Sequence, residues 1–355
     1  MANKMFVLNL GSTSTKVAVF EDTNEIVKET LQHSQEDLRQ FSKITDQKGF
    51  RKEAILSFLI KNNFPLDTFD CIVARGGCTK PIEGGIYYIT REMLSDMESG
   101  LYGMHVSNVG CMIAYELGEE YQIPVITANT VSTDELCSFA RYSGIKEAPR
   151  VSTFHALNHK AIARSYAKQI GRAYEDLNLV VVHLGGGISV GTHQKGRVID
   201  TNNALEGDGS FSPERAGTLP VGAVVRMCFS GSYTEEQMMH HLRGGGGLMS
   251  YLGTNSGLEV EQRAENGDAY AREVFEAMAY QVAKEVGGAA TILKGNVDAI
   301  LLTGSMAYSD IFTGWLIDRI SFLAPVLKFP GENEMLSLAE NGIRFLNKIE
   351  EVKEY

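Results

Sequence analysis

Apolar residues and glycines follow a distinctive order between Val180 and Asp200, near the middle of the chain. β-Branched residues run into the polar His183, three consecutive glycines follow, and apolar residues then return. This order predicts a strand, a tight turn and a second strand. Because glycine lacks a Cβ atom, the backbone of such a turn can bind an anion through its N–H groups, although a mobile hairpin tip gives the same pattern. The candidate phosphate-binding residues are Gly185, Gly186 and Gly187.

The same pattern opens the chain. An apolar run from Phe6 to Leu10 leads into a small, hydroxyl-rich turn, and a second apolar run ends at Phe20. Aligning Gly11 with Gly185 offsets the two copies by 174 residues (185 − 11), which is close to half of the 355-residue chain. Two halves that each begin with strand, turn and strand predict a duplicated α/β domain with a cleft between the copies.

A third junction between an apolar strand and a small turn comes late in the chain, where residues 299–303 lead into Gly304 and Ser305. This turn would contact the remainder of a bound nucleotide. Each of the three turns alone is weak support, but together they predict a phosphate-binding cleft between two domains.

The other elements follow from the period of the apolar residues. We predict helices over residues 50–61, 93–101, 113–120, 234–242, 268–294, 311–323 and 333–349, and a helix that ends near residue 171. We predict further strands over residues 25–30, 69–74, 122–127 and 325–329. The first domain is expected to span residues 1–149 and to be completed by residues 333–355, and the second to span residues 150–332.

Composition narrows the classes of partner. The hydrophobic fraction of 44% and the charged fraction of 22% are those of an ordinary globular protein. The net charge of −11 argues against nucleic acid or an anionic membrane as a partner, because both favour basic surfaces. The five cysteines show no C-x-x-C spacing, which indicates thiols in a reducing compartment. The chain has neither a signal segment nor a run of 18 apolar residues, so we expect a cytoplasmic protein.

Two arginines and three histidines lie where they could act on a phosphate. Arg75 follows a predicted strand and precedes two glycines, and Arg215 lies in a long polar loop over residues 200–220. The histidines are His105, His155 and His183. Motifs of the P-loop and of dinucleotide-binding folds are absent from the sequence. Separated cations suit phosphoryl transfer, which requires mainly positioning and neutralisation of charge.

The chain resembles the acetate and butyrate kinase family, and most closely its butyrate-specific members. The resemblance is carried by LNLGSTSTKVAVF, FHALNHKA, VVVHLGGGISVG, DTNNALEGDGSFSPERAGTLP, LLTGSMAYSD and FPGENEMLSLAEN, and it covers essentially the whole chain. It implies two actin-like domains of the ribonuclease H type with an interdomain cleft. It also implies reversible, Mg²⁺-dependent phosphoryl transfer between ATP and a short-chain fatty acid, which gives ADP and an acyl phosphate. A homodimer or higher homo-oligomer is expected.

The resemblance further implies a role for each candidate residue. Arg75 and Arg215 would hold the carboxylate and the transferring phosphoryl group, His155 would stabilise the transition state, and His183 would face the phosphates. His105 and Asn129 are matched to the substrate pocket. The residues matched to nucleotide binding are Asn9, Gly11, Ser12, Ser14, Lys16, Gly185, Gly186, Gly187, Gly304 and Ser305. The residues matched to the Mg²⁺ site are Asn9 and Glu334.

Several alternatives stay open. Asn129 stands where the family pattern has an acid, so either the nearby Asp134 compensates or activity is reduced. An acetate or propionate kinase, a non-catalytic nucleotide-binding switch and a sugar kinase of the same fold remain. A sugar kinase would need an aspartate to deprotonate a hydroxyl, whereas a carboxylate is already ionised and needs no base. His155 and His159 have the i, i+4 spacing of metal ligands, but zinc is disfavoured because no third ligand is evident.

Overall fold

The computed structural model describes residues 2–205 and 207–355. The chain divides into two compact units, Met1–Thr133 with Asn333–Tyr355, and Asp134–Glu332. The second unit begins 16 residues before the predicted boundary at residue 150 (150 − 134) because Glu135 is held within it. The Glu135 carboxylate accepts hydrogen bonds from Lys160 Nζ at 2.8 Å and from the Val198 amide at 2.7 Å. The limits of the functional domains stay a prediction.

The first unit is built on a seven-stranded sheet with the order β12-β5-β6-β4-β1-β2-β3. Strand β1 pairs antiparallel with β2 and parallel with β4, the central strand of the seven, and β4 pairs parallel with β6. The strands are β1 (Lys4–Gly11), β2 (Ser14–Glu21), β3 (Asn24–Gln32), β4 (Cys71–Ala74), β5 (Ile86–Tyr88), β6 (Val125–Ala128) and β12 (Val352–Lys353).

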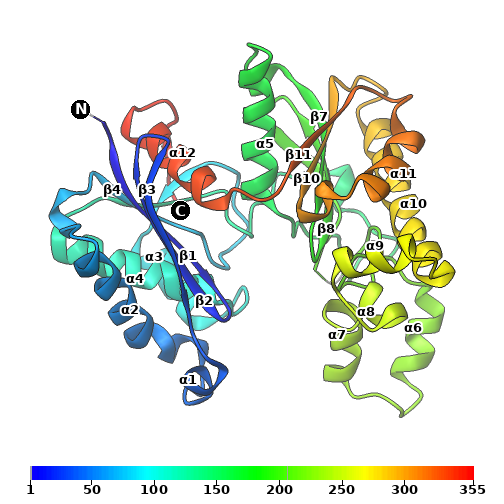
Figure 1. The fold of residues 1–355 in the computed structure, drawn as a ribbon, viewed down its shortest axis with the longest axis horizontal. Helices are drawn as coiled ribbons and strands as arrows, with labels where there is room; N and C mark the ends of the chain where they lie inside the picture. Colours follow the sequence, from blue (N-terminus) through cyan, green and yellow to red (C-terminus); the bar gives the residue numbers. More distant parts are fainter. Residues whose placement is uncertain (1, 206) are drawn as a thin grey trace. The chain divides into compact units, whose positions relative to one another are not determined.

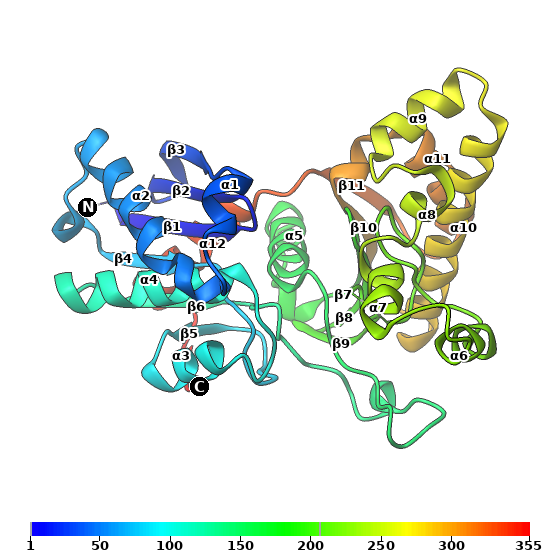
Figure 2. The same cartoon turned by 90° about the horizontal axis from the view of Figure 1, so that it is seen from below.

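Helices cover both faces of this sheet. Leu10 packs against Gly110 of α4, whereas Met5 packs against Gly342 of α12. Because successive residues of a strand point to opposite faces, these two contacts place α4 and α12 on opposite sides of β1. Helix α2 lies beside α4 (Figures 1 and 2). The helices of this unit are α1 (Gln35–Arg39), α2 (Lys48–Lys61), α3 (Arg91–Ser99), α4 (Val106–Tyr121) and α12 (Glu334–Leu346).

The second unit is built on a five-stranded sheet with the order β11-β10-β7-β8-β9. Strands β7, β8 and β9 form an antiparallel meander, and β10 pairs parallel with both β7 and β11. The strands are β7 (Asn178–Leu184), β8 (Ile188–Gln194), β9 (Arg197–Thr201), β10 (Ala299–Gly304) and β11 (Val326–Pro330).

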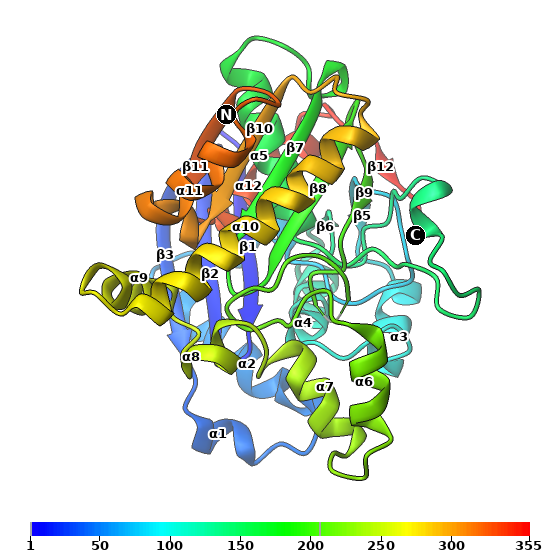
Figure 3. The ribbon, with the colours of Figure 1, turned by 90° about the vertical axis from the view of Figure 1, so that its right-hand side faces the viewer.

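This sheet also has a helix on each face. Val180 and Val182 pack with apolar residues of α10, and Leu179 and Val181 pack with those of α5. All seven residues of β7 are buried because the strand is covered on both sides, and Figure 3 shows α10 crossing one face of the sheet. The helices are α5 (Ala156–Gln169), α6 (Val221–Cys228), α7 (Glu235–Arg243), α8 (Leu248–Leu252), α9 (Gly257–Glu265), α10 (Ala269–Ile292) and α11 (Asp310–Ile320).

The two sheets share one topology. Reading β3-β2-β1-β4-β6 against β9-β8-β7-β10-β11 matches an antiparallel meander followed by two parallel strands in each unit. Gly11 ends β1, and the triple glycine lies between β7 and β8, so the two predicted turns occupy equivalent places. This agreement accounts for the internal repeat of the sequence.

Some elements differ from the sequence-based expectation. Strands β5 and β12, of three and two residues, are too short to show a period. Four helices, α1, α6, α8 and α9, occupy segments for which no element was predicted. Among the described residues, no helix is both long and apolar enough to cross a membrane.

Candidate functional site

A buried arginine holds the turn between β1 and β2. Arg51, on α2, is 0% exposed. Its Nη1 atom donates to the carbonyl oxygens of Gly11 at 3.1 Å and Ser14 at 3.0 Å, and Nη2 donates to the carbonyl of Ser12 at 2.8 Å. A further bond from Nη1 reaches Thr15 Oγ1 at 3.0 Å. The guanidinium group therefore fixes the turn through the backbone itself.

This arginine has no salt bridge among the described residues, so backbone carbonyls take the place of a carboxylate. Burial lowers its pKa to about 10, which still leaves the group charged at neutral pH. The carbonyl groups of the turn are occupied by this cation, while Ser12 and Lys16 are exposed. The turn thus carries an unneutralised positive charge and exposed donors, which favours an anionic ligand.

A polar cluster lies at the ends of β1 and β4. Asn9 Nδ2 donates to Glu334 Oε2 at 2.7 Å, and Arg75 Nη1 donates to Asn9 Oδ1 at 3.3 Å. The same arginine nitrogen lies 3.3 Å from Glu334 Oε1. Glu334 is in the first turn of α12, so a segment distant in sequence completes the cluster. The structure brings together these three predicted site residues.

His105 and Asn129, the residues matched to the substrate pocket, both lie in the first unit. His105 caps α4, where its Nδ1 atom accepts from the Ser107 amide at 3.2 Å. Burial, and then the positive charge of Arg75, lower the pKa of His105 below its usual value. Asn129 has a left-handed backbone with φ 47°, and it exchanges two hydrogen bonds with Gly85. Its side-chain oxygen therefore supports the local backbone.

Asp134, which could compensate for the missing acid at position 129, is already paired with an arginine. Asp134 makes two hydrogen bonds with Arg141, at 2.7 and 2.8 Å. The amide of Asn129 supplies the acceptor that Gly85 needs, as a carboxylate would. Its Nδ2 group is buried without a hydrogen bond among the described residues.

The triple-glycine turn of the second unit is held by the loop over residues 200–220. The Gly186 carbonyl accepts from Ser212 Oγ at 2.7 Å and from the Glu214 amide at 3.2 Å. The Gly185 amide donates to the Gly187 carbonyl at 3.2 Å within the turn. As in the first unit, side-chain and backbone donors bind a carbonyl group of the turn and fix its conformation.

Two stacked histidines lie against this turn. The rings of His155 and His183 are 3.7 Å apart at their centroids, with 13° between their planes. His183 is buried on β7, where Nδ1 lies 2.9 Å from Asn158 Oδ1 and Nε2 lies 3.1 Å from Glu332 Oε1. His155 precedes α5, and its Nδ1 atom lies 2.8 Å from Ser189 Oγ.

Both rings approach the glycines closely. A Cβ atom on Gly185 would lie 2.8 Å from His183 Nε2, and one on Gly187 would lie 3.6 Å from His155 Cε1. The first of these distances is shorter than a van der Waals contact, so only glycine fits at position 185 beside this imidazole. The predicted second turn and its two histidines therefore form one cluster.

Arg215 is in the supporting loop of the second unit. Its Nη1 atom lies 3.2 Å from Glu214 Oε2 and donates to the carbonyl oxygen of Arg243. The Nε atom is buried without a hydrogen bond among the described residues. A guanidinium group with an unused N–H can donate a hydrogen bond to an anionic oxygen.

The third predicted turn follows β10. Gly304 has φ 90°, and a Cβ atom there would lie 2.4 Å from the Leu184 carbonyl oxygen. Glycine is required because both the backbone angle and the space exclude a side chain. Its amide donates to the Gly331 carbonyl at 3.2 Å, and the exposed Ser305 begins a 3₁₀ turn.

Sequence reasoning missed the residues that support the turns and the histidines, which are Arg51, Asn158, Ser189 and Ser212. Arg51 lies within a segment of helical period and, from the sequence, is indistinguishable from a solvated arginine. Ser189 lies two residues after Gly187, and period-two alternation places it on the same face of its strand as that glycine. The two-residue spacing from Gly187 is therefore the sequence feature that could have identified Ser189.

The oxygen donors in the first unit suit a hard cation. Among the described residues, no group of three or more His, Cys, Asp or Glu side chains could hold a metal by itself. Mg²⁺ commonly takes one or two carboxylates together with phosphate oxygens and water. Glu334 offers a carboxylate, and the neighbouring Asn9 offers an amide oxygen that accepts from Arg75 in this structure, so these are the two oxygen donors that such a shared site could use.

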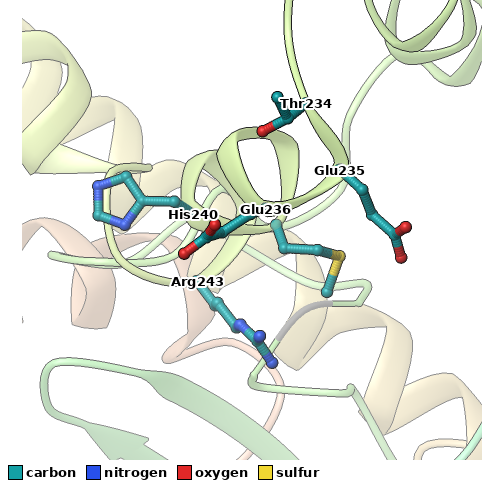
Figure 4. A pocket seen from close by; sticks show the side chains of 6 residues that line it. Thr234, Glu235, Glu236, His240 and Arg243 are labelled. Atoms are coloured by element: carbon teal, nitrogen blue, oxygen red, sulfur yellow. The ribbon is translucent and has the colours of Figure 1, made fainter.

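A hollow of about 840 Å³ lies along α7, and none of the described residues that line it is a predicted site residue. The labelled side chains, Thr234, Glu235, Glu236, His240 and Arg243, all come from this helix and its cap (Figure 4). They do not converge on one point, since Glu235 and His240 lie on opposite sides of the helix in Figure 4. We therefore do not assign the reaction to this hollow.

Known proteins resemble the chain over its full length. Residues 141–310 match the model of the Acetokinase family. The chain is 48% identical to Butyrate kinase 2 of Clostridium acetobutylicum, with 100% of both chains covered. It is 47% identical to the probable butyrate kinase of Clostridium botulinum, again with 100% of both covered.

A solved structure supports the fold. Acetate kinase of Porphyromonas gingivalis matches with a TM-score of 0.81 over 97% of this chain and 100% of that chain, at 17% identity. The predicted fold class, an α/β protein of two duplicated actin-like domains of the ribonuclease H type, is confirmed by this likeness and by the repeated sheet topology.

The support of the first turn by Arg51 gives a prediction. We expect Arg51→Gln to lower the free energy of unfolding by about 3 kcal/mol, because the turn carbonyls lose buried donors. Arg51→Lys should lose less but not recover the wild-type value, since one ammonium group cannot reach three carbonyls in a fork geometry. Urea denaturation followed by circular dichroism measures both.

The matched control is Arg91→Gln, which removes an arginine whose side chain is 84% exposed. It should change the free energy of unfolding by no more than about 0.5 kcal/mol. Amide chemical shifts of residues 11–15 should move in the Arg51 variants alone. Equal losses for Arg51→Gln and Arg91→Gln would contradict the assigned support.

Proposed function

Because the chain belongs to the acetate and butyrate kinase family, we propose that it transfers a phosphoryl group reversibly between ATP and butyrate or a similar short-chain fatty acid. The products in the forward direction are ADP and an acyl phosphate. The single observation that carries the proposal is the match of 48% identity to a butyrate kinase, with complete coverage of both chains. The glycine turns, with their arginines and histidines, provide the chemistry that this reaction needs.

The reaction requires that two anions be held together. A carboxylate oxygen of the acid forms a bond to the γ-phosphorus while the bond from that phosphorus to the β-phosphate oxygen breaks. No proton has to be removed, because the carboxylate is ionised at neutral pH. Catalysis therefore depends on cations and N–H donors that offset negative charge on the transferring group.

We assign these donors to the predicted residues. Arg75 and Arg215 would bind the carboxylate and the transferring phosphoryl group, since a planar guanidinium matches two oxygens at once. His155 would donate a hydrogen bond to the phosphoryl oxygens, and His183, stacked on it, would face the phosphate chain. His105, which Arg75 helps to keep neutral, would line the substrate pocket.

The nucleotide would bind to the three glycine turns. We assign phosphate contacts to Gly11, Ser12, Ser14 and Lys16, with Asn9 beside them, and to Gly185, Gly186 and Gly187. Gly304 and Ser305 are assigned to the adenosine. Mg²⁺, when bound, would reduce the negative charge of the phosphates, and Glu334 and Asn9 would supply its protein oxygens.

Because Asn129 replaces an acid of the family pattern, the rate of phosphoryl transfer has to be measured. The contacts of Asn129 with Gly85 support a structural role that an amide fulfils. The alternatives are a fully active butyrate kinase, an acetate or propionate kinase, and a homologue weakened by this residue.

We place the protein in the cytoplasm, a reducing compartment, and its five free cysteines support this assignment.

A panel of carboxylates from two to six carbons, assayed with ATP and Mg²⁺ by hydroxamate formation, tests the proposed function. Butyrate should exceed acetate in kcat/KM by up to about tenfold, because each buried methylene contributes ~0.8 kcal/mol. Acetate as the equal or better substrate would overturn the preference for butyrate. If every acid reacts slowly and Asn129→Asp restores the rate, the weakened homologue is correct.

The role of Arg215 gives a second prediction. Arg215→Ala should lower kcat by about 10³-fold while the Kd for ATP stays within a few-fold, since arginines of this kind stabilise the transition state. Arg215→Lys should recover little, because a point charge does not reproduce the guanidinium fork. Arg91→Ala, which removes an arginine whose side chain is 84% exposed, is the control and should keep full activity. Near-normal turnover of Arg215→Ala would refute this site.

The expected homodimer or larger homo-oligomer is also a proposal. Helix α6 buries none of its residues, and Val221 and Phe229 are 72% and 88% exposed, which favours a further copy as their cover. Light scattering should give at least twice the 39.0 kDa of one chain. Phe229→Asp should reduce that mass, and a monomeric wild-type protein would contradict the proposal.

A further inference from the structure

A continuous chain of hydrogen bonds leads from a buried tyrosine to His155. Tyr174 OH lies 2.7 Å from His193 Nδ1, and His193 Nε2 lies 3.3 Å from His159 Nδ1. His159 Nε2 then lies 2.9 Å from Ser189 Oγ, which in turn lies 2.8 Å from His155 Nδ1. Four hydrogen bonds therefore connect five side chains within the second unit.

The middle of this chain is closed to solvent. Ser189, His159 and His193 are 0% exposed, and Tyr174 is 3% exposed. Burial lowers the pKa of His159 and of His193 well below the usual value, so each ring is neutral and carries one proton. Burial also raises the pKa of Tyr174, so its hydroxyl keeps its proton.

Counting protons leaves two arrangements for the chain. Each of the four bonds needs one proton, and each internal member has one proton to give. If Tyr174 donates to His193, every later bond points the same way, and Ser189 donates to His155 Nδ1. If the order is reversed, His155 Nδ1–H donates to Ser189, and the Tyr174 hydroxyl only accepts.

The tyrosine decides between the two directions. Among the described residues, the only hydrogen bond of the Tyr174 hydroxyl is the one to His193 Nδ1. In the reversed order its O–H group would be buried without an acceptor, which disfavours that order roughly tenfold or more. The forward direction satisfies every proton of the chain. His155 then accepts at Nδ1, and its own proton is on Nε2.

We propose that Tyr174, His193, His159 and Ser189 are positioning residues that fix His155 as the tautomer with its proton on Nε2. The other edge of the His155 ring faces the triple-glycine turn, since a Cβ atom on Gly187 would lie 3.8 Å from His155 Nε2. The fixed tautomer presents an N–H donor at this turn. The tautomer does not depend on the proposed function, whereas donation of this N–H group to a phosphoryl oxygen does.

A glycine makes the central bond possible. A Cβ atom on Gly191 would lie 2.7 Å from His159 Nδ1 and 3.2 Å from His193 Nε2, the two atoms that form this bond. Any other residue at position 191 would therefore push the two rings apart. Gly191→Ala is accordingly a variant that interrupts the chain at its middle while leaving Tyr174 in place.

The tautomer can be measured without any reaction. Long-range ¹H–¹⁵N spectra of the full chain labelled with ¹⁵N-histidine distinguish a protonated Nδ1 from a protonated Nε2, and His155→Gln assigns the signal. In the wild-type protein we expect His155 to be protonated on Nε2 in about nine molecules of ten or more, from the cost of the unpaired hydroxyl. Protonation mainly on Nδ1 would overturn the proposal without need of any variant.

Tyr174→Phe tests the direction of the chain. Without the hydroxyl, both directions leave His193 Nδ1 unpaired, so the two tautomers of His155 should become comparably populated. We expect kcat to fall two- to tenfold while KM for ATP and for the acid stays within twofold. Gly191→Ala should shift the tautomer in the same sense. Tyr166→Phe, which changes a buried tyrosine of α5 outside the chain, should leave the spectrum unchanged.

The outcomes separate this proposal from the proposed function. An unchanged His155 tautomer in Tyr174→Phe would refute the positioning role, whatever the activity. A tautomer that shifts as expected in a protein inactive on every carboxylate would support the hydrogen-bond chain and refute the assigned reaction. Loss of kcat with an unchanged tautomer would show that Tyr174 acts through packing alone.

Discussion

The turn between β1 and β2 and the turn between β7 and β8 are both held by donors that bind their carbonyl groups. In the first unit the donor is the buried cation of Arg51, and in the second it is the Ser212 hydroxyl with the Glu214 amide. Once carbonyl groups are bound in this way, the turn is rigid before any ligand arrives, and binding costs less conformational entropy.

The two units share a topology but differ in how this support is achieved. The first uses a full charge without a carboxylate partner among the described residues, so its turn has a positive potential of its own. The second uses neutral donors and places two imidazole rings beside the glycines. The first turn therefore suits static binding of phosphate, whereas the second can present directed N–H donors where charge changes during transfer.

The fold was predictable where the signal was periodic or repeated. The turns after β1 and β7 and the long helix α10 follow from glycine runs and apolar spacing. Helix α9 was missed although Ser256 and Glu259 have the spacing of a helix cap, and the Ser256 side chain does accept from the Glu259 amide. At the site, two arginines and three histidines were predicted, whereas Arg51 was not. An arginine surrounded by carbonyl groups is a property of tertiary structure alone.

The stacked histidines show why a fixed proton matters at this site. The rings of His155 and His183 stack with 3.7 Å between their centroids, so the donor that each ring presents is set within one small cluster. A hydrogen-bond chain that makes His155 an acceptor at Nδ1 fixes which ring nitrogen of His155 can donate. His155 still offers a donor at Nε2, because a neutral imidazole needs only one proton to donate. Direction, rather than charge, is then what the buried tyrosine contributes to the site.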